Sequence, residues 1–295
     1  MMKNRFTAMV AARRAFMGRK GLRRRAPRWL HPSGIERDYV RAITAMVGLL
    51  EQEIKNRLIS RLPHFKKQSD LYRGDDFLDD IRELMNALGI AAGVIFKDVE
   101  AMAFLFADKI SNFNRGQYRR IINATLGVDP ISNDDWLRAQ LKLFAQENAT
   151  LIKSIPETML KDVEGVVYRG LQGGATIRDM EKDISDKFGV SRRKARLIAR
   201  DQTGKLNSAL TEIRQKRVGI EEYIWNDASD ERVRDSHKAL DGKICRWDDP
   251  TVYRNPGEAE WRKRSSIGGV EKHPGAEIQC RCWAEPIMED LINAQ

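Results

Sequence analysis

Apolar residues recur at helical spacing over most of the chain, and this periodicity constrains the fold more than any other feature. The pattern begins near Glu36, continues with short interruptions to about Arg217, and stops at Gly219. Amphipathic helices bury their apolar stripes by packing against one another. The 295 residues are 42% hydrophobic, which is enough for a sizeable core. The larger part of the chain is therefore predicted to be helical.

Prolines, glycines and polar stretches divide this helical part. Pro63 is predicted to end the first helix, and the polar residues after it to form a loop. Gly89, Pro156 and Gly189 are predicted to separate later helices. The segment 90–110 is apolar nearly all round, so it is expected to be the most buried helix. The predicted helices span about 36–61, 76–88, 90–110, 136–154, 156–171, 176–187 and 192–217.

The sequence changes character after Gly219. Residues 221–226 are predicted to form a strand, residues 231–239 a short helix, and residues 278–287 a closing strand. The intervening residues 243–277 are rich in proline and glycine, which indicates loops with a β-ribbon. The predicted fold class is mainly α: a long helical N-terminal part followed by a small α+β C-terminal module.

Positive charge is concentrated at the amino terminus. Residues 1–30 contain ten lysines or arginines and no acidic residue, and the rest of the chain contains 42 basic and 42 acidic residues. The chain is therefore divided into a basic flexible arm (1–34), a helical domain (35–189) and an α+β module (190–295).

A cationic arm of this kind binds polyanions by displacing their counterions. Docking on an acidic protein surface and simple solvation are the alternatives. No stretch of the sequence reaches the length that a membrane span needs. Three cysteines, an odd number, argue against a disulfide scaffold and favour a reducing compartment. Nucleic-acid binding is predicted for Arg13, Arg14, Arg19, Lys20, Arg23, Arg24, Arg25 and Arg28.

Polar residues that ionise or hold turns are dense in the last third of the chain. Asp230 is predicted to cap the short helix. Arg232 and Arg234 are predicted to pair with carboxylates such as Asp235 or Asp241. Asp241 is followed by a glycine expected to adopt a positive φ. The prominent members of this set are Arg200, Asp201, Asp230, Arg232, Arg234, His237, Asp241 and Gly242.

The same region holds all three cysteines and two of the four histidines. Cys280 and Cys282 would lie on one face of the predicted closing strand, because side chains alternate along a strand. With His237 and His273 they offer the two thiolates and two imidazoles of a tetrahedral zinc site, so a structural zinc is a candidate cofactor. Cys245 is the expected bystander. The alternative is buried free thiols beside a hydrogen-bonded structural histidine.

The order and spacing of these residues resemble the head morphogenesis family of tailed bacteriophages, the Mu F-like minor head proteins. The resemblance covers about residues 190–290, and Pro32 to Glu36 with Tyr39 also resembles the start of many such proteins. Cys245 departs from the family, which usually has an aromatic or aliphatic residue there. The matching motifs are 198–203, 223–225, Asp230 through Gly242, and His273-Pro274-Gly275 leading to Cys280-Arg281-Cys282.

The resemblance implies a minor head (capsid) protein of the virion that is not an enzyme. Its implied partners are the portal protein and/or the major capsid protein, in the head interior. It is also implied to contact the packaged double-stranded DNA or to aid its exit. Assembly would take place in the host cytoplasm. One alternative is a zinc-dependent nuclease or hydrolase built on the histidines and cysteines, with Asp235 or Asp241 as base. Another is a cellular nucleic-acid-binding protein.

Overall fold

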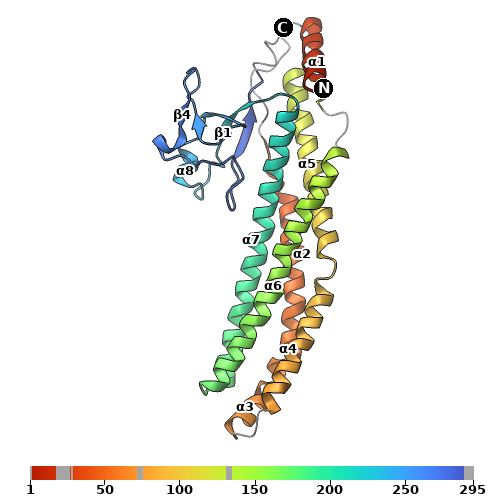
Figure 1. Cartoon of the computed structure of the whole chain (residues 1–295), viewed down its shortest axis with the longest axis vertical. Helices are drawn as coiled ribbons and strands as arrows, with labels where there is room; N and C mark the ends of the chain where they lie inside the picture. The colour runs from red at the N-terminus through yellow and green to blue at the C-terminus, as the bar shows by residue number, and fades with distance from the viewer. Residues whose placement is uncertain (1, 18–26, 28, 72–75, 131–134, 289–295) are drawn as a thin grey trace. The chain divides into compact units, whose positions relative to one another are not determined.

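The computed structural model (Figure 1) consists mostly of long helices, with short strands confined to the C-terminal part. This confirms the predicted mainly α fold with a small C-terminal sheet module. In the part of the chain that is described, no helix is both long and apolar enough to cross a membrane. The structure describes residues 2–17, 27, 29–71, 76–130 and 135–288.

Eight α-helices and three short 3-10 helices are found in these residues. The α-helices are α1 (Met2–Met17), α2 (Ser33–Arg57), α3 (Leu62–Asp70), α4 (Asp76–Ile95), α5 (Val99–Leu126), α6 (Arg138–Gln172), α7 (Ile177–Arg217) and α8 (Asp235–Lys238). The 3-10 helices are η2 (Ile59–Arg61), η3 (Asp135–Leu137) and η4 (Arg264–Ile267).

Helices α6 and α7 are continuous where breaks were predicted. Pro156 lies inside α6 and Gly189 inside α7. An interior proline costs a helix about 3 kcal/mol and a glycine about 1 kcal/mol. Burial of one large apolar side chain offsets about 1.5–3 kcal/mol, so tertiary packing outweighs the local preference. The buried side chains around these two positions are Ile152, Ile155, Met159, Ile184 and Phe188.

The earlier helix boundaries also differ from the prediction. Pro63 lies in the first turn of α3, where the missing N–H costs nothing, so this segment is a helix rather than a loop. Gly89 lies inside α4, between buried Leu88 and Ala92 on one continuous apolar stripe. The break falls instead at residues 96–98, between α4 and α5.

The prediction that residues 90–110 form the most buried helix is wrong. The segment is divided between α4 and α5, and three of its large apolar side chains are exposed: Ile90 (72%), Val94 (62%) and Leu105 (61%). Their positions therefore belong to the outer faces of the two helices. Apolar residues on all sides of this segment were therefore not sufficient to predict its burial.

The folded chain contains two compact units, and neither is a single stretch of sequence. Unit 1 comprises Met1–Ile35, Ala107–Leu141 and Asp201–Gln295, and unit 2 comprises Glu36–Phe106 and Lys142–Arg200. The boundaries fall inside α2, α5, α6 and α7. This division differs from the linear one at residues 34 and 189, because distant segments of the sequence contribute to each unit.

Unit 2 has a helical core with a buried polar element. Tyr39 of α2 stacks on Phe106, with ring centroids 4.2 Å apart, and accepts a hydrogen bond from Asn148. Glu51 is only 2% exposed and forms an ion pair with Arg192 of α7. The guanidinium of Arg192, which is itself about half exposed, compensates the desolvation of the buried Glu51 carboxylate.

In unit 1, the amino-terminal helix is packed rather than free. Phe6 and Val10 of α1 are 4% and 1% exposed and join a core cluster with Trp29 and Tyr118. This differs from the predicted flexible arm over 1–34, at least for residues 2–17. The most basic part of that arm, residues 18–26 and 28, lies outside the described residues.

Unit 1 also contains the sheets. Strand β1 (Glu222–Asn226) lies between β2 (Ile244–Arg246) and β5 (Trp283–Pro286), antiparallel to both. A second antiparallel pair is formed by β3 (Val252–Tyr253) and β4 (Arg262–Lys263). Figure 1 shows this module beside the C-terminal part of α7.

The strand predicted at 221–226 is confirmed as β1, whose Tyr223 and Trp225 are fully buried. The closing strand is shorter than predicted and begins at Trp283. Cys280 and Cys282 therefore precede the strand instead of lying on it.

Candidate metal centre

Cys280 and Cys282 lie in a short irregular segment, residues 277–282, which we refer to as the Cys loop. Gln279 has a left-handed φ of 57°, unusual for a residue other than glycine, so the backbone turns sharply just before Cys280. Gly275, shortly before the loop, has a φ of 81°. The two thiols converge because of these turns, rather than through strand alternation.

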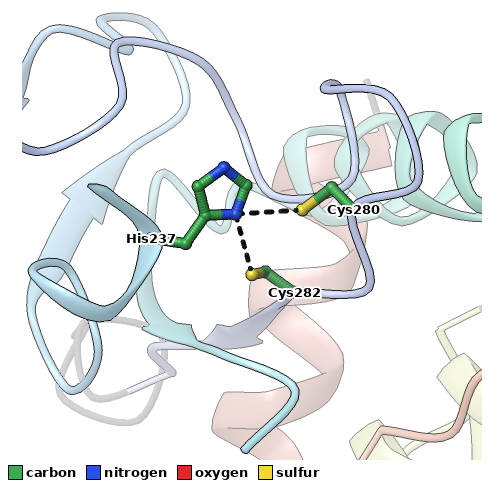
Figure 2. A group of neighbouring side chains, drawn as sticks. All are labelled: His237, Cys280 and Cys282. Atoms are coloured by element: carbon green, nitrogen blue, oxygen red, sulfur yellow. Dashed lines mark hydrogen bonds between the residues drawn. The ribbon is translucent and has the colours of Figure 1, made fainter. Parts of the chain in front are cut away.

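Both thiols face the imidazole of His237, which comes from the short helix α8 (Figure 2). His237 Nδ1 lies 3.3 Å from Cys282 Sγ and 3.4 Å from Cys280 Sγ. The three ligand atoms all lie within 4.8 Å of one another. The residues are buried, with exposures of 2%, 6% and 7% for His237, Cys280 and Cys282.

The other ring nitrogen of His237 determines how the ring is oriented. Nε2 lies 3.0 Å from Glu277 Oε2, and a carboxylate can only accept a hydrogen bond. Nε2 therefore carries a hydrogen and donates it, which leaves Nδ1 facing the sulfurs. Glu277 is itself held by Arg234, 3.4 Å away, and Lys272, 3.6 Å away.

The two cysteines have opposite pKa shifts because they share a proton. The pKa of the Cys280 thiol is lowered to about 4 because Cys282 donates a hydrogen bond to it, and His237 donates a further one. The pKa of Cys282 is raised by the same contact with Cys280 and by burial. The pKa of His237 is raised, first by its hydrogen bond to Cys280 and also by Glu277. These contacts favour the thiolate form of Cys280.

Three motif residues from elsewhere in the sequence hold the Cys loop in place. Asp201 of α7 accepts a 3.0 Å hydrogen bond from the backbone N–H of Gln279. Arg234 donates to the carbonyl of Ile278 at 2.8 Å. Asp230 forms an ion pair with Arg281 inside the loop. Residues dispersed over about 80 positions of sequence therefore converge on one short segment.

The remaining motif residues have local roles. Asp241 Oδ1 accepts a 2.9 Å hydrogen bond from the backbone N–H of Asp227. Gly242 has a φ of 73°, so the expected positive-φ turn is confirmed. Arg200 is exposed and lies 3.5 Å from Glu36, within unit 2. Arg232 is exposed, and its backbone N–H donates to Asp230 Oδ1 at 3.0 Å.

Two predicted local contacts are wrong. Asp230 does not cap α8, because the helix begins later and its N-cap position is occupied by Arg234. Arg234 pairs with Glu277 rather than with Asp235 or Asp241, because the fold brings the Cys loop next to it. The side chain of Asp235 is fully exposed and lies 3.5 Å from Lys238.

His273, the fourth predicted metal ligand, lies outside the cluster. Its Nδ1 is 3.0 Å from Tyr223 Oη, and its ring packs against Trp247 with centroids 5.0 Å apart. Burial lowers its pKa. Cys245, the expected bystander, also lies elsewhere, opposite Tyr223 in the sheet, and burial raises the pKa of its thiol to about 11. The structure therefore brings together three of the four predicted ligands.

Sequence reasoning missed the role of Glu277. No periodicity marks this residue, and its only local signal is an acidic side chain close to Cys280. It also missed the contribution of α7 beyond Asp201. A Cβ on Gly204 would lie 3.2 Å from the carbonyl oxygen of Cys280, so a glycine allows the loop to approach the helix closely.

A cavity of about 150 Å³ borders the Cys loop within unit 1. Its walls include both cysteines of the cluster, Gly204 and Ser208 of α7, and Trp29. One imidazole and two thiols form the kind of donor set that binds zinc. The cavity offers a route by which an ion or a water molecule can reach it.

The predicted nucleic-acid-binding residues are mostly beyond what the structure describes. Arg13 lies on α1 with its side chain against the turn at Gly127, where an added Cβ would lie 2.9 Å from Arg13 Nε. Arg14 is also on α1, but its side chain is not among those described. DNA binding by this segment stays a prediction. The residues outside the described part are Arg19, Lys20, Arg23, Arg24, Arg25 and Arg28.

Comparison with known proteins places the motif region in context. Residues 161–285 match the family described as "Phage Mu protein F like protein". The chain is 35% identical over 143 residues to an uncharacterized protein of Haemophilus influenzae, an alignment covering 48% of this chain and 28% of the relative. It is 27% identical over 155 residues to the minor head protein GP7 of Bacillus phage SPP1, covering 47% and 46%.

A longer alignment is found with the uncharacterized protein YqbB of Bacillus subtilis, which is 20% identical over 264 residues, covering 88% of this chain and 76% of the relative. The chain spans less than half the length of the Haemophilus and SPP1 relatives. No solved structure matches the chain.

Proposed function

Because residues 161–285 match the phage Mu protein F-like family, we propose that the chain is a minor head protein of a tailed bacteriophage. The family match carries the proposal, since it spans every motif residue from Arg200 to Cys282. The similarity to GP7 of Bacillus phage SPP1 supports it, because that relative is named a minor head protein.

The role we propose is structural rather than enzymatic. Asp201, Asp230 and Arg234 are all engaged in holding the Cys loop, so their charges serve local structure. A rigid C-terminal module of this kind suits a protein that must present a fixed surface to its neighbours. We place the protein in the virion, in the head interior near the portal, with the portal or major capsid protein as partner after assembly in the host cytoplasm.

The basic amino-terminal segment is proposed to contact the packaged DNA. Residues 1–30 combine ten positive charges with no negative charge, and such a segment neutralises phosphates without sequence preference. Helix α1 packs into the core of unit 1. The DNA contact is therefore proposed for the basic residues that follow α1, between positions 18 and 28.

A second candidate, a zinc-dependent nuclease or hydrolase, is favoured by one observation, the convergence of His237, Cys280 and Cys282. The proposed bases do not support it: Asp235 is a fully exposed side chain beside Lys238, and Asp241 accepts a backbone hydrogen bond. Incubating the zinc-loaded chain with linear DNA tests it, and cleavage that is lost in the Cys282→Ser variant would favour this candidate over the head protein.

Composition of phage particles tests the main proposal. Particles produced from a genome that encodes this chain are separated into empty heads and DNA-filled particles, and both are analysed by mass spectrometry. A minor head protein is expected in both, at a small fraction of the major capsid protein. If the chain is produced in infected cells but absent from both kinds of particle, the proposal is wrong.

The DNA contact needs a variant that leaves α1 intact. Deleting residues 1–30 would remove Phe6 and Val10 from the core. We therefore replace only basic residues after α1 with glutamine. DNA affinity is then measured as a function of salt concentration. Each lost phosphate contact lowers the salt slope by about 0.9, so the slope is expected to fall by up to about 5. The residues changed are Arg19, Lys20, Arg23, Arg24, Arg25 and Arg28.

A matched control changes six exposed cations elsewhere and keeps the net charge equal to that of the first variant. The arm is the DNA contact if only the first variant loses its salt dependence. Equal salt slopes for the wild type and the first variant would contradict this proposal. An equal decrease in salt slope in both variants would contradict it as well. The control residues are Lys97, Arg120, Lys142, Lys161, Arg178 and Lys182.

A further inference from the structure

We propose that His237, Cys280 and Cys282 bind one zinc ion, which links α8 to the chain that enters β5. The proposal rests on the geometry of these three buried side chains and does not depend on the assignment to a phage head. The ion would fasten together two segments separated by more than 40 residues of sequence.

The distances suit a zinc ion. In a tetrahedral site with Zn–N of about 2.0–2.1 Å and Zn–S of about 2.3 Å, nitrogen and sulfur lie roughly 3.6 Å apart. His237 Nδ1 lies 3.3 Å and 3.4 Å from the two sulfurs, and all three atoms fall within 4.8 Å of one another. Both nitrogen–sulfur distances are therefore within about 0.3 Å of those in a tetrahedral zinc site.

The surroundings of the cluster support the same conclusion. A histidine that binds zinc through one nitrogen usually donates the other N–H to a carboxylate, which fixes the orientation of the ring. Glu277 occupies this position, 3.0 Å from His237 Nε2. The backbone N–H of Gly275 lies 3.3 Å from Cys280 Sγ, so it donates to a thiolate that also binds the metal.

A metal ion explains the symmetry of the cluster better than a proton does. Without metal, His237 Nδ1–H and the thiol of Cys282 both donate to Cys280, which does not account for the nearly equal distances from Nδ1 to the two sulfurs. A zinc ion engages both sulfurs and the nitrogen at once. Soft thiolates and imidazole select zinc over magnesium or calcium, which prefer oxygen ligands.

The cluster supplies three protein ligands among the described residues. A fourth position is then left for a water molecule, and the adjoining cavity of about 150 Å³ gives access to it. Because the ligands come together only in the folded chain, the binding free energy of the metal becomes folding free energy. Removal of zinc is therefore expected to loosen the Cys loop.

Metal analysis of the purified full-length chain tests the proposal. We expect about one zinc per chain in the wild type, by analogy with sites that use imidazole and thiolate ligands. The Cys280→Ser and Cys282→Ser variants should lose the metal. The matched control is Cys245→Ser, which removes an equally buried thiol outside the cluster and should retain zinc. Zinc content that is equal in all four proteins would overturn the proposal.

A measurement on the wild type alone avoids the risk that a variant fails to fold. The chain is stripped of metal and reloaded with Co²⁺, and its visible spectrum and X-ray absorption are recorded. Tetrahedral cobalt with two sulfur ligands is the expected result. A spectrum without sulfur ligation, or no binding at all by the folded chain, would overturn the proposal.

Thiol accessibility supplies an independent readout. In the folded, metal-loaded chain, Cys280 and Cys282 should resist alkylation, and removal of zinc with a chelator should expose them. Cys245 is fully buried and should stay protected in both states. If the chelator leaves the reactivity of Cys280 and Cys282 unchanged in a chain that contained zinc, the ion is bound elsewhere.

Discussion

Glu277 Oε2 lies 3.0 Å from Nε2 of His237, and this contact determines which ring nitrogen faces the two cysteines. Glu277 and His237 are 40 residues apart in the sequence. The Cys loop therefore contacts His237 of α8 through three side chains: the two thiols and the Glu277 carboxylate.

Replacing Glu277 with glutamine should weaken zinc binding. A glutamine oxygen still accepts the hydrogen bond, but it lacks the charge that makes the imidazole a stronger ligand, and loss of such a partner lowers metal affinity by about 10- to 100-fold. Competition with a chromophoric chelator measures the change. Glu271→Gln, an exposed carboxylate nearby, is the control and should leave affinity unchanged. An unaltered affinity in Glu277→Gln would show that the carboxylate does not support the metal.

Asp201→Ala should destabilise unit 1. The carboxylate accepts a partly buried hydrogen bond from the backbone N–H of Gln279, and loss of such a bond typically lowers the free energy of unfolding by about 0.5–1.5 kcal/mol. Asp201→Asn keeps an acceptor oxygen and should cost less than half as much. Urea denaturation measures both. If the two variants are equally destabilised, the ion pair with Lys205 is the important contact instead.

Gly275→Ala should destabilise the protein more than Gly257→Ala. Both glycines have a positive φ, 81° and 84°, so alanine is strained by about 1–2 kcal/mol at either position. At Gly275 the added Cβ would also lie 2.5 Å from the Cβ of Ser208, whereas nothing lies within 4 Å at Gly257. Overpacking of this kind costs about 1–3 kcal/mol more. Equal unfolding free energies for the two variants would mean that the loop can move away from α7.

Phe6→Ala tests whether the amino-terminal helix is part of the core. Phe6 is 4% exposed, and removal of a buried phenylalanine side chain typically lowers the free energy of unfolding by about 3–5 kcal/mol. Met9→Ala, on the same helix but 41% exposed, is the control and should have little effect. Indistinguishable denaturation curves for Phe6→Ala and wild type would restore the flexible-arm prediction for this segment.

His273 should make stability depend on pH in mildly acidic solution. Burial lowers its pKa below the ordinary value of 6.5, so the unfolded chain takes up the proton first. The contribution of neutral His273 to the free energy of unfolding is fully present above pH 6.5. It is lost as the pH falls from 6.5 through the folded-state pKa, by at most about 1.4 kcal/mol per pH unit. The charged groups that act on it are Glu212, Arg264, Lys216 and Asp248.

The measurement is the difference in unfolding free energy between wild type and His273→Gln from pH 7.5 to 5. His237 has a raised pKa and contributes with the opposite sign, but it is present in both proteins and largely cancels. The advantage of the wild type over the variant should shrink as the pH falls. A difference that is constant, or that grows toward acid, would contradict a lowered pKa for His273.

Features that depend on local order could be predicted from the amino-acid sequence alone. Helical spacing of apolar residues predicted the helical part, the alternation around Tyr223 and Trp225 predicted β1, and Gly242 was predicted to adopt a positive φ. The candidate ligands His237, Cys280 and Cys282 could be chosen because few residue types bind zinc. These predictions succeed because each depends on neighbouring residues and on side-chain chemistry.

The ends of the helices and the contacts between distant residues depend instead on long-range packing. Pro156 and Gly189 stay inside helices because burial of their neighbours outweighs the local cost, and no short window of sequence contains that energy. Backbone turns at Gly275 and Gln279 place the Cys loop against α7 and α8. As a result, Glu277 contacts His237, and His273 contacts Tyr223 instead of the two cysteines. Such contacts join segments tens of residues apart, so their geometry exists only once the whole unit has folded.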